Sequence, residues 1–414
     1  MFDVPAVDHV SSVSPAQAAE IALSHYGVTG MAQRLASEHD DTFLLAGADG
    51  AARLLKISVA PDPGAAATGL PLPASPGVAT GGAPGFQTAL LLHLARVAPD
   101  LPAQRVIPAL DGQPEITIMI ERAGIERAGE DGAADGTGGG GPRLVRLTSW
   151  LDGQLLGRET SSVGLRREIG GTLARLNVAL RGFTHPGARR THEWDLQNLG
   201  ALRPLLDALP ESGLLPSVGR ALAADGLAAD GLAADGLREL LDGGVRAALA
   251  DCLDRFDAVV RPALASVPTQ VIHTDFHGEN LLTDGGERIV GILDFGDALD
   301  GPVAMDVGVA ACYQLGAGGP GRDLLAPALD VVAGYHAVDP LSAADLDLVA
   351  EFLLARVAAR IIVSQSNAAR EPANSGYLLR RTPQAVAQLA ALRALPLDEI
   401  ARRLRAGCRL EVVR

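Results

Sequence analysis

The sequence is poor in cysteine and in positive charge, and both shortages exclude classes of protein. Its 414 residues include three cysteines, Cys252, Cys312 and Cys408, which lie far apart and form no CxxC pair. This odd, scattered set argues against a disulfide framework or a zinc knuckle and is typical of a reducing cytosol. The net charge of −14 argues against nucleic acid as a partner, because its phosphates would repel the chain. We therefore expect a cytoplasmic protein that does not bind nucleic acid.

Long hydrophobic runs are also lacking. The most apolar helix-like stretch, Leu348 to Val363, contains Glu351, Arg356 and Arg360, so we expect a buried helix rather than a membrane span. The N-terminus, MFDVPAVDHVSS, has neither a basic start nor an apolar core, so no signal peptide is expected. With 48% hydrophobic residues, the chain is long enough for two lobes and a sizeable core.

Lysine is almost absent. The chain holds 35 lysines and arginines in total, and Lys56 is the only lysine among them. It lies in an apolar, strand-like run, Arg53-Leu54-Leu55-Lys56-Ile57. An ammonium group is a compact point charge on a flexible stem, and a planar guanidinium cannot replace it at every site. The lone lysine therefore favours a functional role, and the alternative is a surface strand lysine with a solvated head.

What the sequence does contain is one stretch with several chemically active side chains, Val271 to Gly296 (VIHTDFHGENLLTDGGERIVGILDFG). The pattern indicates a strand, a loop, a hairpin and then an aspartate at a strand end. Phosphoryl transfer needs a carboxylate that orients and deprotonates an attacking hydroxyl, and oxygen ligands for the magnesium ions that hold the phosphates. We predict that Asp275 is this base and that Asn280 and Asp294 are the magnesium ligands.

Two other interpretations of this stretch remain open at the level of sequence. His273, Asp275 and His277 could form a transition-metal cluster, because imidazoles suit zinc or iron, but that leaves Asn280 and Asp294 unexplained. Asp275 and Asp294 could also be ordinary turn carboxylates, which are common at strand ends. The ordered spacing of the two aspartates and the asparagine favours catalysis over both alternatives.

The segments HTDFHGEN and ILDFGD together resemble the aminoglycoside phosphotransferases, and more closely their hydroxylysine-kinase-like relatives. The family pattern is H-x-D-x-x-x-x-N followed by D-[FWY]-[GE], and this chain matches it at His273, Asp275, Asn280, Asp294 and Gly296. The resemblance implies an α+β, two-lobed protein-kinase-like fold, with a small antiparallel-sheet N-lobe and a mostly helical C-lobe. It also implies that ATP or GTP binds with Mg²⁺ in the cleft between the lobes.

The resemblance divides the chain near residue 150. Residues 1–150 are expected to be the nucleotide-binding N-lobe, and residues 151–414 the helical C-lobe with the catalytic and metal-binding loops. Three stretches of biased composition are predicted to be insertions: 61–85 is rich in Ala, Gly and Pro, 123–141 contains four consecutive glycines, and 222–236 repeats Leu-Ala-Ala-Asp-Gly.

Within the N-lobe, the resemblance gives Lys56 the role of the kinase strand lysine that pairs with nucleotide phosphates. The loop Ser37–Asp41 would lie over the phosphates, although it has no GxGxxG and its acidic residues would be an unusual lining. The spacing predicts a helix over Phe86–Val97, where kinases place a glutamate that orients the lysine. This chain has Gln87 there, which could accept a hydrogen bond from Lys56, or could be an exposed helix residue.

Three polar residues of the C-lobe remain to be interpreted. Trp194 and Asp195 could border the substrate, or Asp195 could simply cap a helix. Asp306, at the start of a predicted helix, matches an aspartate of the family. We interpret Asp306 as a structural anchor for the catalytic loop rather than a metal ligand.

Together these patterns predict a small-molecule kinase that transfers the γ-phosphate of ATP or GTP to a hydroxyl group. The acidic charge favours an amine-bearing, cationic acceptor, such as hydroxylysine, an aminoglycoside or another amino alcohol. A second hypothesis is a catalytically weak, nucleotide-binding regulatory protein, which the missing helix glutamate and the missing glycine-rich loop would explain. The intact Asp275, Asn280 and Asp294 favour the enzyme.

Overall fold

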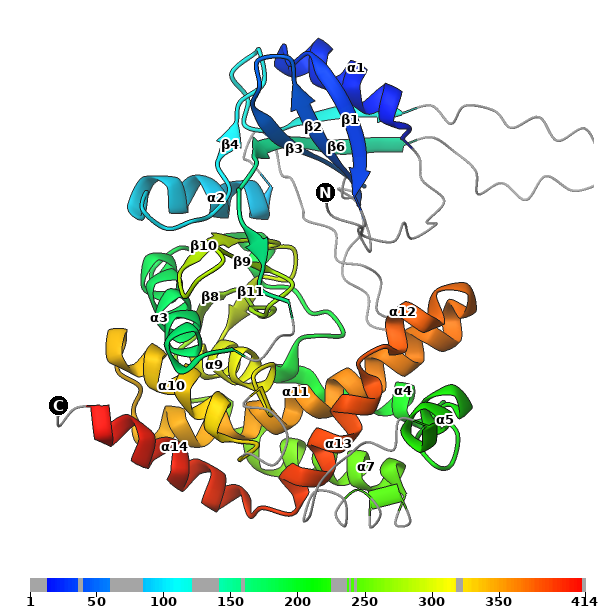
Figure 1. Ribbon diagram of the computed structural model, residues 1–414, viewed down its shortest axis with the longest axis vertical. Helices are drawn as coiled ribbons and strands as arrows, with labels where there is room; N and C mark the ends of the chain where they lie inside the picture. Colours follow the sequence, from blue (N-terminus) through cyan, green and yellow to red (C-terminus); the bar gives the residue numbers. More distant parts are fainter. Residues whose placement is uncertain are drawn as a thin grey trace, which may run out of the picture. The chain divides into compact units, whose positions relative to one another are not determined.

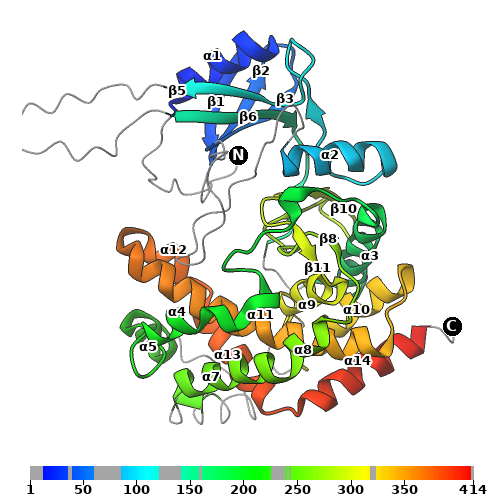
Figure 2. The same cartoon turned by 180° about the vertical axis from the view of Figure 1, so that it is seen from behind.

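The structure is a computed structural model, and it separates into two compact units (Figures 1 and 2). Unit 1 comprises residues 1–99, 103–151 and 185–187, and unit 2 comprises residues 100–102, 152–184 and 188–414. Most of each predicted insertion, and residues 37–39 of the predicted phosphate loop, lie outside the described residues. The described residues are 13–35, 40–59, 85–120, 141–157, 161–224, 237, 240–241, 244–317 and 323–411.

Unit 1 is built on an antiparallel sheet, as predicted for the N-lobe. Strands β1, β2, β3, β6 and β4 follow one another in the sheet, and β5 also pairs with β6. The strands are β1 Gly30–Leu35, β2 Asp41–Gly47, β3 Ala52–Val59, β4 Val106–Ile107, β5 Ile116–Ile120 and β6 Gly141–Ser149.

One face of this sheet packs against helix α1 (Pro15–Tyr26), which Figure 1 shows lying along the strands. Ser14 is the N-cap of this helix, and Gly27 has the left-handed conformation at its C-cap. Side chains alternate between the two faces of a strand, so Lys56 points away from the face that is packed against α1. The core comprises Ala18, Ala22, Tyr26, Phe43, Leu45, Leu55, Ile57, Val145 and Leu147 with smaller neighbours.

Helix α2 (Phe86–Val97) has the bounds that its apolar spacing predicted. It buries Phe86, Leu90, Leu91 and Leu94 on one side. Its N-cap, Gly85, has no side chain to accept a hydrogen bond from the first turn. The carboxylate of Glu115, just before β5, accepts from the Gly85 N–H and from the Thr88 hydroxyl in its place.

Unit 2 is mostly helical, as predicted for the C-lobe. Helix α3 packs against α10, and the contact is so close that a Cβ on Gly170 would lie 1.9 Å from the Val331 carbonyl oxygen. The helices are α3 Val163–Leu180, α4 Arg203–Asp207, α5 Pro216–Ala224, α7 Val245–Arg255, α8 Arg261–Leu264, α9 Val303–Cys312, α10 Ala326–Val338, α11 Ala343–Arg370, α12 Ser375–Leu379, α13 Thr382–Arg393 and α14 Leu397–Glu411. Shorter segments are the 3₁₀ helices η1 Pro186–Ala188, η2 Leu196–Leu202 and η4 Pro372–Asn374 and the π-helix η3 Phe256–Val260.

The long helix α11 forms the centre of unit 2. It contacts α9, α13 and α14 and is buried along most of its length (Figure 2). Its buried residues include two arginines, Arg356 and Arg360, which are only 2% and 6% exposed. Within the described parts of the chain, no helix has both the length and the hydrophobicity that a membrane crossing requires.

Five short strands of unit 2 position the loops that carry the predicted chemistry. Strand β8 (Gln270–Ile272) pairs with β11 (Leu299–Gly301), and β9 (Leu281–Thr283) pairs with both β10 (Ile289–Ile292) and β7 (Gln154–Leu155). The loop after β8 therefore enters β9, and the loop after β10 enters β11. Because each loop connects the same two small sheets, the two loops lie beside each other.

Candidate active site

The loop that follows β8 is anchored by a buried carboxylate. Asp306 of α9 is 0% exposed, and its two oxygens accept from the backbone N–H groups of His273 and Thr274 at 3.1 and 2.8 Å. This confirms the interpretation of Asp306 as a structural anchor. Thr274 has a φ of 67°, a conformation that is costly for a β-branched residue, and the Asp306 contacts hold it there.

His273 ties this loop to the neighbouring one. Its Nδ1 accepts from the backbone N–H of Asp275 at 3.3 Å, so the ring proton is on Nε2, which donates to the Leu293 carbonyl at 3.0 Å. Leu293 immediately precedes Asp294. The histidine therefore fixes the distance between the two loops.

The carboxylate of Asp275 is held by donors on both of its oxygens. Oδ1 accepts from Arg356 Nη2 at 2.6 Å. Oδ2 accepts from His277 Nε2 at 3.1 Å and from Asn280 Nδ2 at 2.7 Å. The Asp275 side chain is still 21% exposed, so it can also meet a substrate. Three donors on one carboxylate define its orientation, which is what a group that aligns an attacking hydroxyl requires.

The surroundings of Asp275 also fix its charge. Burial raises the pKa of its carboxyl, but the donors His277 and Arg356 outweigh burial and hold that pKa well below its usual range. The carboxylate is therefore ionised at neutral pH. It can accept a hydrogen bond from a substrate hydroxyl, and it takes the proton only as the phosphorus–oxygen bond forms.

The geometry of the two histidines does not fit the transition-metal alternative. Nδ1 of His277 accepts from the Glu279 backbone N–H at 3.2 Å, while its Nε2 donates to Asp275. With the contacts of His273, both nitrogens of each ring are already engaged within the protein. In the described residues, no group of three or more histidine, cysteine, aspartate or glutamate side chains is arranged to hold a metal ion.

Asn280 and Asp294 lie at the same end of the β9–β10 hairpin. The Leu293 N–H donates to the Asn280 carbonyl at 2.9 Å, which extends the pairing of the two strands to the residue before Asp294. Because Nδ2 of Asn280 donates to Asp275, its Oδ1 remains as the acceptor atom of the amide. Asp294 is exposed and has a φ of 50°. A carboxylate and an amide oxygen are ligands that Mg²⁺ prefers, so this pair fits the predicted role.

Backbone strain is concentrated at these two loops. Among the described residues, Thr274 and Asp294 are the only ones besides glycine with positive φ. The segment after Asp294 is held by Arg190, whose guanidinium donates to the carbonyls of Gly296 and Ala298. Strained residues that the surroundings hold in place are typical of functional sites.

The sequence did not predict the role of Arg356. It lies 81 residues after Asp275, in the stretch whose charges we used only as evidence against a membrane span. Its guanidinium also donates to the Tyr313 hydroxyl at 2.9 Å and lies 4.6 Å from the ring centroid of Trp194. Trp194 was predicted to be a possible border of the substrate site, and it contacts the residue that holds Asp275.

Asp195 has a capping role. Its side chain accepts from the Gln197 N–H at 3.1 Å, at the start of the η2 turn. It also accepts from the Asn198 side-chain amide at 2.8 Å. Of the two interpretations left open for this residue, the structure supports helix capping.

The two predicted nucleotide-binding residues are in unit 1. Lys56 forms an ion pair with Asp40 at 2.9 Å. Arg146, which is the direct partner of Lys56 in the β3–β6 register, donates to Gln87 Oε1 at 2.6 Å and to the Thr88 hydroxyl at 3.1 Å. Gln87 is therefore half-buried and hydrogen-bonded rather than a solvated helix residue, and it accepts this bond from Arg146.

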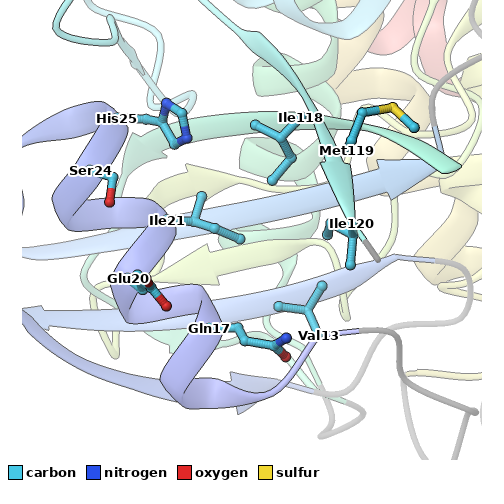
Figure 3. Close-up of a pocket in the computed structure, with 9 residues that line it drawn as sticks. All are labelled: Val13, Gln17, Glu20, Ile21, Ser24, His25, Ile118, Met119 and Ile120. Carbon is cyan, nitrogen blue, oxygen red and sulfur yellow. The ribbon is translucent and has the colours of Figure 1, made fainter. Parts of the chain in front are cut away.

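A separate cavity of about 290 Å³ lies in unit 1, between α1 and β5 (Figure 3). Its lining includes Ile21 and Glu20 of α1 and Ile118 and Ile120 of β5, which face one another in the figure. None of the predicted site residues lines it. The chemistry that the sequence predicts is therefore not associated with this cavity.

Comparison with known proteins identifies the family. The sequence matches the model of the phosphotransferase enzyme family, named APH, over residues 32–346. The chain belongs to this family. The APH match includes both loops of the candidate site. It also includes β3, which carries Lys56, and its neighbours β2 and β6. The chain is therefore a phosphotransferase whose acceptor is a hydroxyl group, and the predicted resemblance is confirmed.

Curated relatives of this APH-family chain carry the name hydroxylysine kinase. The protein of that name from Danio rerio is 25% identical over 402 residues, which cover 95% of this chain and 95% of the relative. The protein of that name from Mus musculus is 23% identical over 248 residues, which cover 57% of each chain.

Solved structures with similar folds are also kinases and phosphotransferases of this type. An amicoumacin kinase in complex with AMP-PNP, Ca²⁺ and Ami superposes with a TM-score of 0.56 at 12% identity, covering 91% of this chain and 93% of its own. An aminoglycoside phosphotransferase from Alicyclobacillus acidocaldarius has a TM-score of 0.52 at 15% identity, covering 96% and 98%. These matches confirm the predicted α+β kinase-like fold.

Proposed function

We propose that this phosphotransferase is an ATP-dependent small-molecule kinase whose acceptor is an amine-bearing hydroxyl compound. The observation that carries the proposal is the Asp275 carboxylate, held by Arg356, His277 and Asn280 beside the exposed Asp294. Asp275 orients the acceptor hydroxyl and receives its proton as the hydroxyl oxygen attacks the γ-phosphorus.

Asn280 Oδ1 and the Asp294 carboxylate are the proposed magnesium ligands. The amide orientation of Asn280 supports this, because its nitrogen makes both hydrogen bonds to Asp275 and its oxygen takes no part in them. Magnesium typically takes one or two protein oxygens and completes its shell with phosphates and water. A bound ion would offset the negative charge of the phosphates, while the side chains fix its position.

Lys56 is the proposed phosphate-binding cation, and Gln87 contributes to the same region of unit 1 through Arg146. Asp40 holds the Lys56 ammonium in the described structure. A nucleotide phosphate offers more negative charge than one carboxylate, so we propose that the ammonium exchanges Asp40 for phosphate when the nucleotide binds. ATP is the proposed donor, and GTP is the alternative.

Two observations support hydroxylysine or a related amino alcohol as the acceptor. The curated relative with 95% coverage is named hydroxylysine kinase. In addition, Asp297 adds a third carboxylate near Asp275 and Asp294: burial is the main cause that raises the pKa of its carboxyl, Asp275 and Asp294 raise it further, and His192 and Arg190 offset this only in part. A substrate ammonium would relieve the repulsion among these carboxylates.

The test is formation of ADP by the purified protein with ATP and Mg²⁺, measured with and without each acceptor. The panel comprises 5-hydroxylysine, aminopropanol and an aminoglycoside, with lysine as the control because it has the amine without the hydroxyl. We expect acceptor-dependent ADP formation with at least one amino alcohol and none with lysine. If nucleotide binds but no acceptor accelerates its consumption, the regulatory alternative is supported instead.

A second measurement separates the donors. Replacing ATP with GTP at equal concentration and the same acceptor should reduce kcat/KM if ATP is the physiological donor. Equal or higher kcat/KM with GTP would contradict our proposal for the donor and would leave the proposed acceptor unaffected.

A further inference from the structure

Burying Arg356 in the core of unit 2 costs free energy. Its side chain is 2% exposed, and its Nε and Nη1 have no hydrogen-bond partner among the residues that the structure describes. A buried cation loses its hydration, and each buried donor without a partner adds a further free-energy cost. A leucine or methionine at this position of α11 would avoid both costs.

A second buried arginine adds to the positive charge in this part of the core. Arg360, one turn further along α11, is 6% exposed and donates to Gln388 Oε1 at 3.0 Å. Among the described residues, no carboxylate lies within ion-pair distance of Arg360. The only carboxylate paired with either buried arginine is therefore Asp275, which Arg356 contacts at 2.6 Å.

Tyr313 contacts two of the residues that donate to Asp275, namely Arg356 and His277. Its hydroxyl accepts from Arg356 Nη2 at 2.9 Å, and its ring stacks on His277 with centroids 4.2 Å apart. Arg356 binds Oδ1 of Asp275 and His277 binds Oδ2, so one tyrosine braces the donors to both oxygens. On the far side, the guanidinium is packed against the ring of Trp194.

We propose that Arg356 is a positioning residue that fixes the orientation of the Asp275 carboxylate. Trp194 and Tyr313 in turn hold the Arg356 guanidinium in place. This inference rests on the proposed function of Asp275. His277 and Asn280 both bind Oδ2 and both belong to the loop that carries Asp275, so without Arg356 the orientation of the carboxylate depends on local contacts to one oxygen. Arg356 adds an anchor on Oδ1 from a different element of the fold, α11, and so defines the plane of the carboxylate. The energetic cost of the buried arginine is then the cost of a preorganised base.

The test compares Arg356→Lys, Arg356→Met and Arg356→Ala with Arg166→Met as the matched control. Arg166→Met also removes a buried, carboxylate-paired arginine from unit 2, and the partners of Arg166 are Asp330 and Ser161 rather than Asp275. Misalignment of a reacting group by about 1 Å costs on the order of 100-fold. We therefore expect kcat to fall about 100-fold in Arg356→Met, with the nucleotide KM within about threefold, and a smaller loss in Arg356→Lys.

Chemical rescue tests the charge itself. In Arg356→Ala, added guanidinium at low millimolar concentration should restore part of the kcat by occupying the space of the missing side chain. Urea has the same shape and no charge, so it should not restore activity. A merely structural role for Arg356 would give no difference between guanidinium and urea, and that result would overturn the proposal.

Two further outcomes keep this inference separate from the proposed function. If Arg356→Met unfolds, the comparison of Arg356→Lys with Arg166→Met decides: equal kcat values overturn the proposal, and a lower kcat in Arg356→Lys supports it. Asp275→Asn tests the function alone. Loss of activity in Asp275→Asn with full activity in the Arg356 variants overturns the positioning role and leaves the function intact, whereas activity in Asp275→Asn refutes both.

Discussion

The side-chain amide of Asn280 donates to Asp275 twice, to its backbone carbonyl at 2.9 Å and to Oδ2 at 2.7 Å. An asparagine can do this while its oxygen remains available for a metal, whereas an aspartate has no N–H to donate. The family pattern has an asparagine at this position, and these contacts give a physical reason for it. The amide nitrogen supports the proposed base, and the amide oxygen is one of the proposed metal ligands.

Replacement of this amide gives the first prediction. Asn280→Asp should lower kcat by at least about 100-fold, because it places a second carboxylate against Asp275 at hydrogen-bond distance. It should also raise the Mg²⁺ concentration needed for half-maximal rate, since the amide oxygen changes position. Initial rates over a Mg²⁺ titration measure both effects. Unchanged kcat together with unchanged Mg²⁺ dependence would show that Asn280 is neither a ligand nor a support for Asp275.

The second prediction concerns the anchor of the loop. Asp306→Asn keeps one acceptor oxygen and replaces the other with an NH₂ group. One of the two backbone N–H groups then faces a donor and loses its hydrogen bond. We expect the free energy of unfolding to fall by about 2–3 kcal/mol, measured by urea denaturation. A change below about 0.5 kcal/mol would contradict the anchoring role, because that is the range of an ordinary surface substitution.

These two residues also show what could be predicted from sequence. The H-x-D-x-x-x-x-N spacing and the apolar runs around it were sufficient to predict the loop and the β9–β10 hairpin. The bounds of α2 followed from apolar spacing alone. In both cases the pattern is local, or repeats along one element, so residue order carries the information. The anchoring role of Asp306 was predicted only from the family resemblance, because its contacts with the loop span 32 and 33 residues.

Other contacts had no such signal. The Arg356 contact with Asp275 joins residues 81 positions apart, and helical periodicity shows that a residue is buried without showing what it meets. The carboxylate of Glu115 at the N-terminus of α2 is 30 residues from Gly85 in the sequence. The short strands β7 and β11 also went unpredicted, because two or three residues are too few to establish a pattern.

The third prediction uses the single lysine. Lys56→Arg keeps the charge, but the planar guanidinium cannot occupy the position of the ammonium, so we expect the KM for ATP to rise by at least about tenfold, or ~1.4 kcal/mol. Arg53→Lys is the matched control on the same strand: Arg53 pairs with Asp49 at 2.6 Å, away from any proposed site residue. Steady-state kinetics with varied ATP distinguish them. An ATP KM unchanged in Lys56→Arg would contradict the phosphate-binding role.

The fourth prediction concerns packing within the catalytic loop. A Cβ on Gly278 would lie 2.6 Å from the Gly157 carbonyl oxygen, so Gly278→Ala must displace backbone on one side or the other. We expect kcat to fall by about 10- to 100-fold, because the loop carries both Asp275 and Asn280. Gly407→Ala, where the added Cβ meets nothing within 4 Å, should have wild-type kinetics. Equal activity of the two variants would show that the loop tolerates this displacement.

The central claim is that the Asp275 carboxylate aligns and deprotonates the acceptor hydroxyl, and one comparison tests it most directly. Asp275→Asn has nearly the same shape and can still bind the acceptor. The measurement is the rate of acceptor phosphorylation at saturating ATP and Mg²⁺, with nucleotide binding monitored in the same samples. The account predicts that Asp275→Asn binds ATP as the wild type does and phosphorylates at least about 1,000-fold more slowly. Phosphorylation within tenfold of the wild-type rate would contradict it.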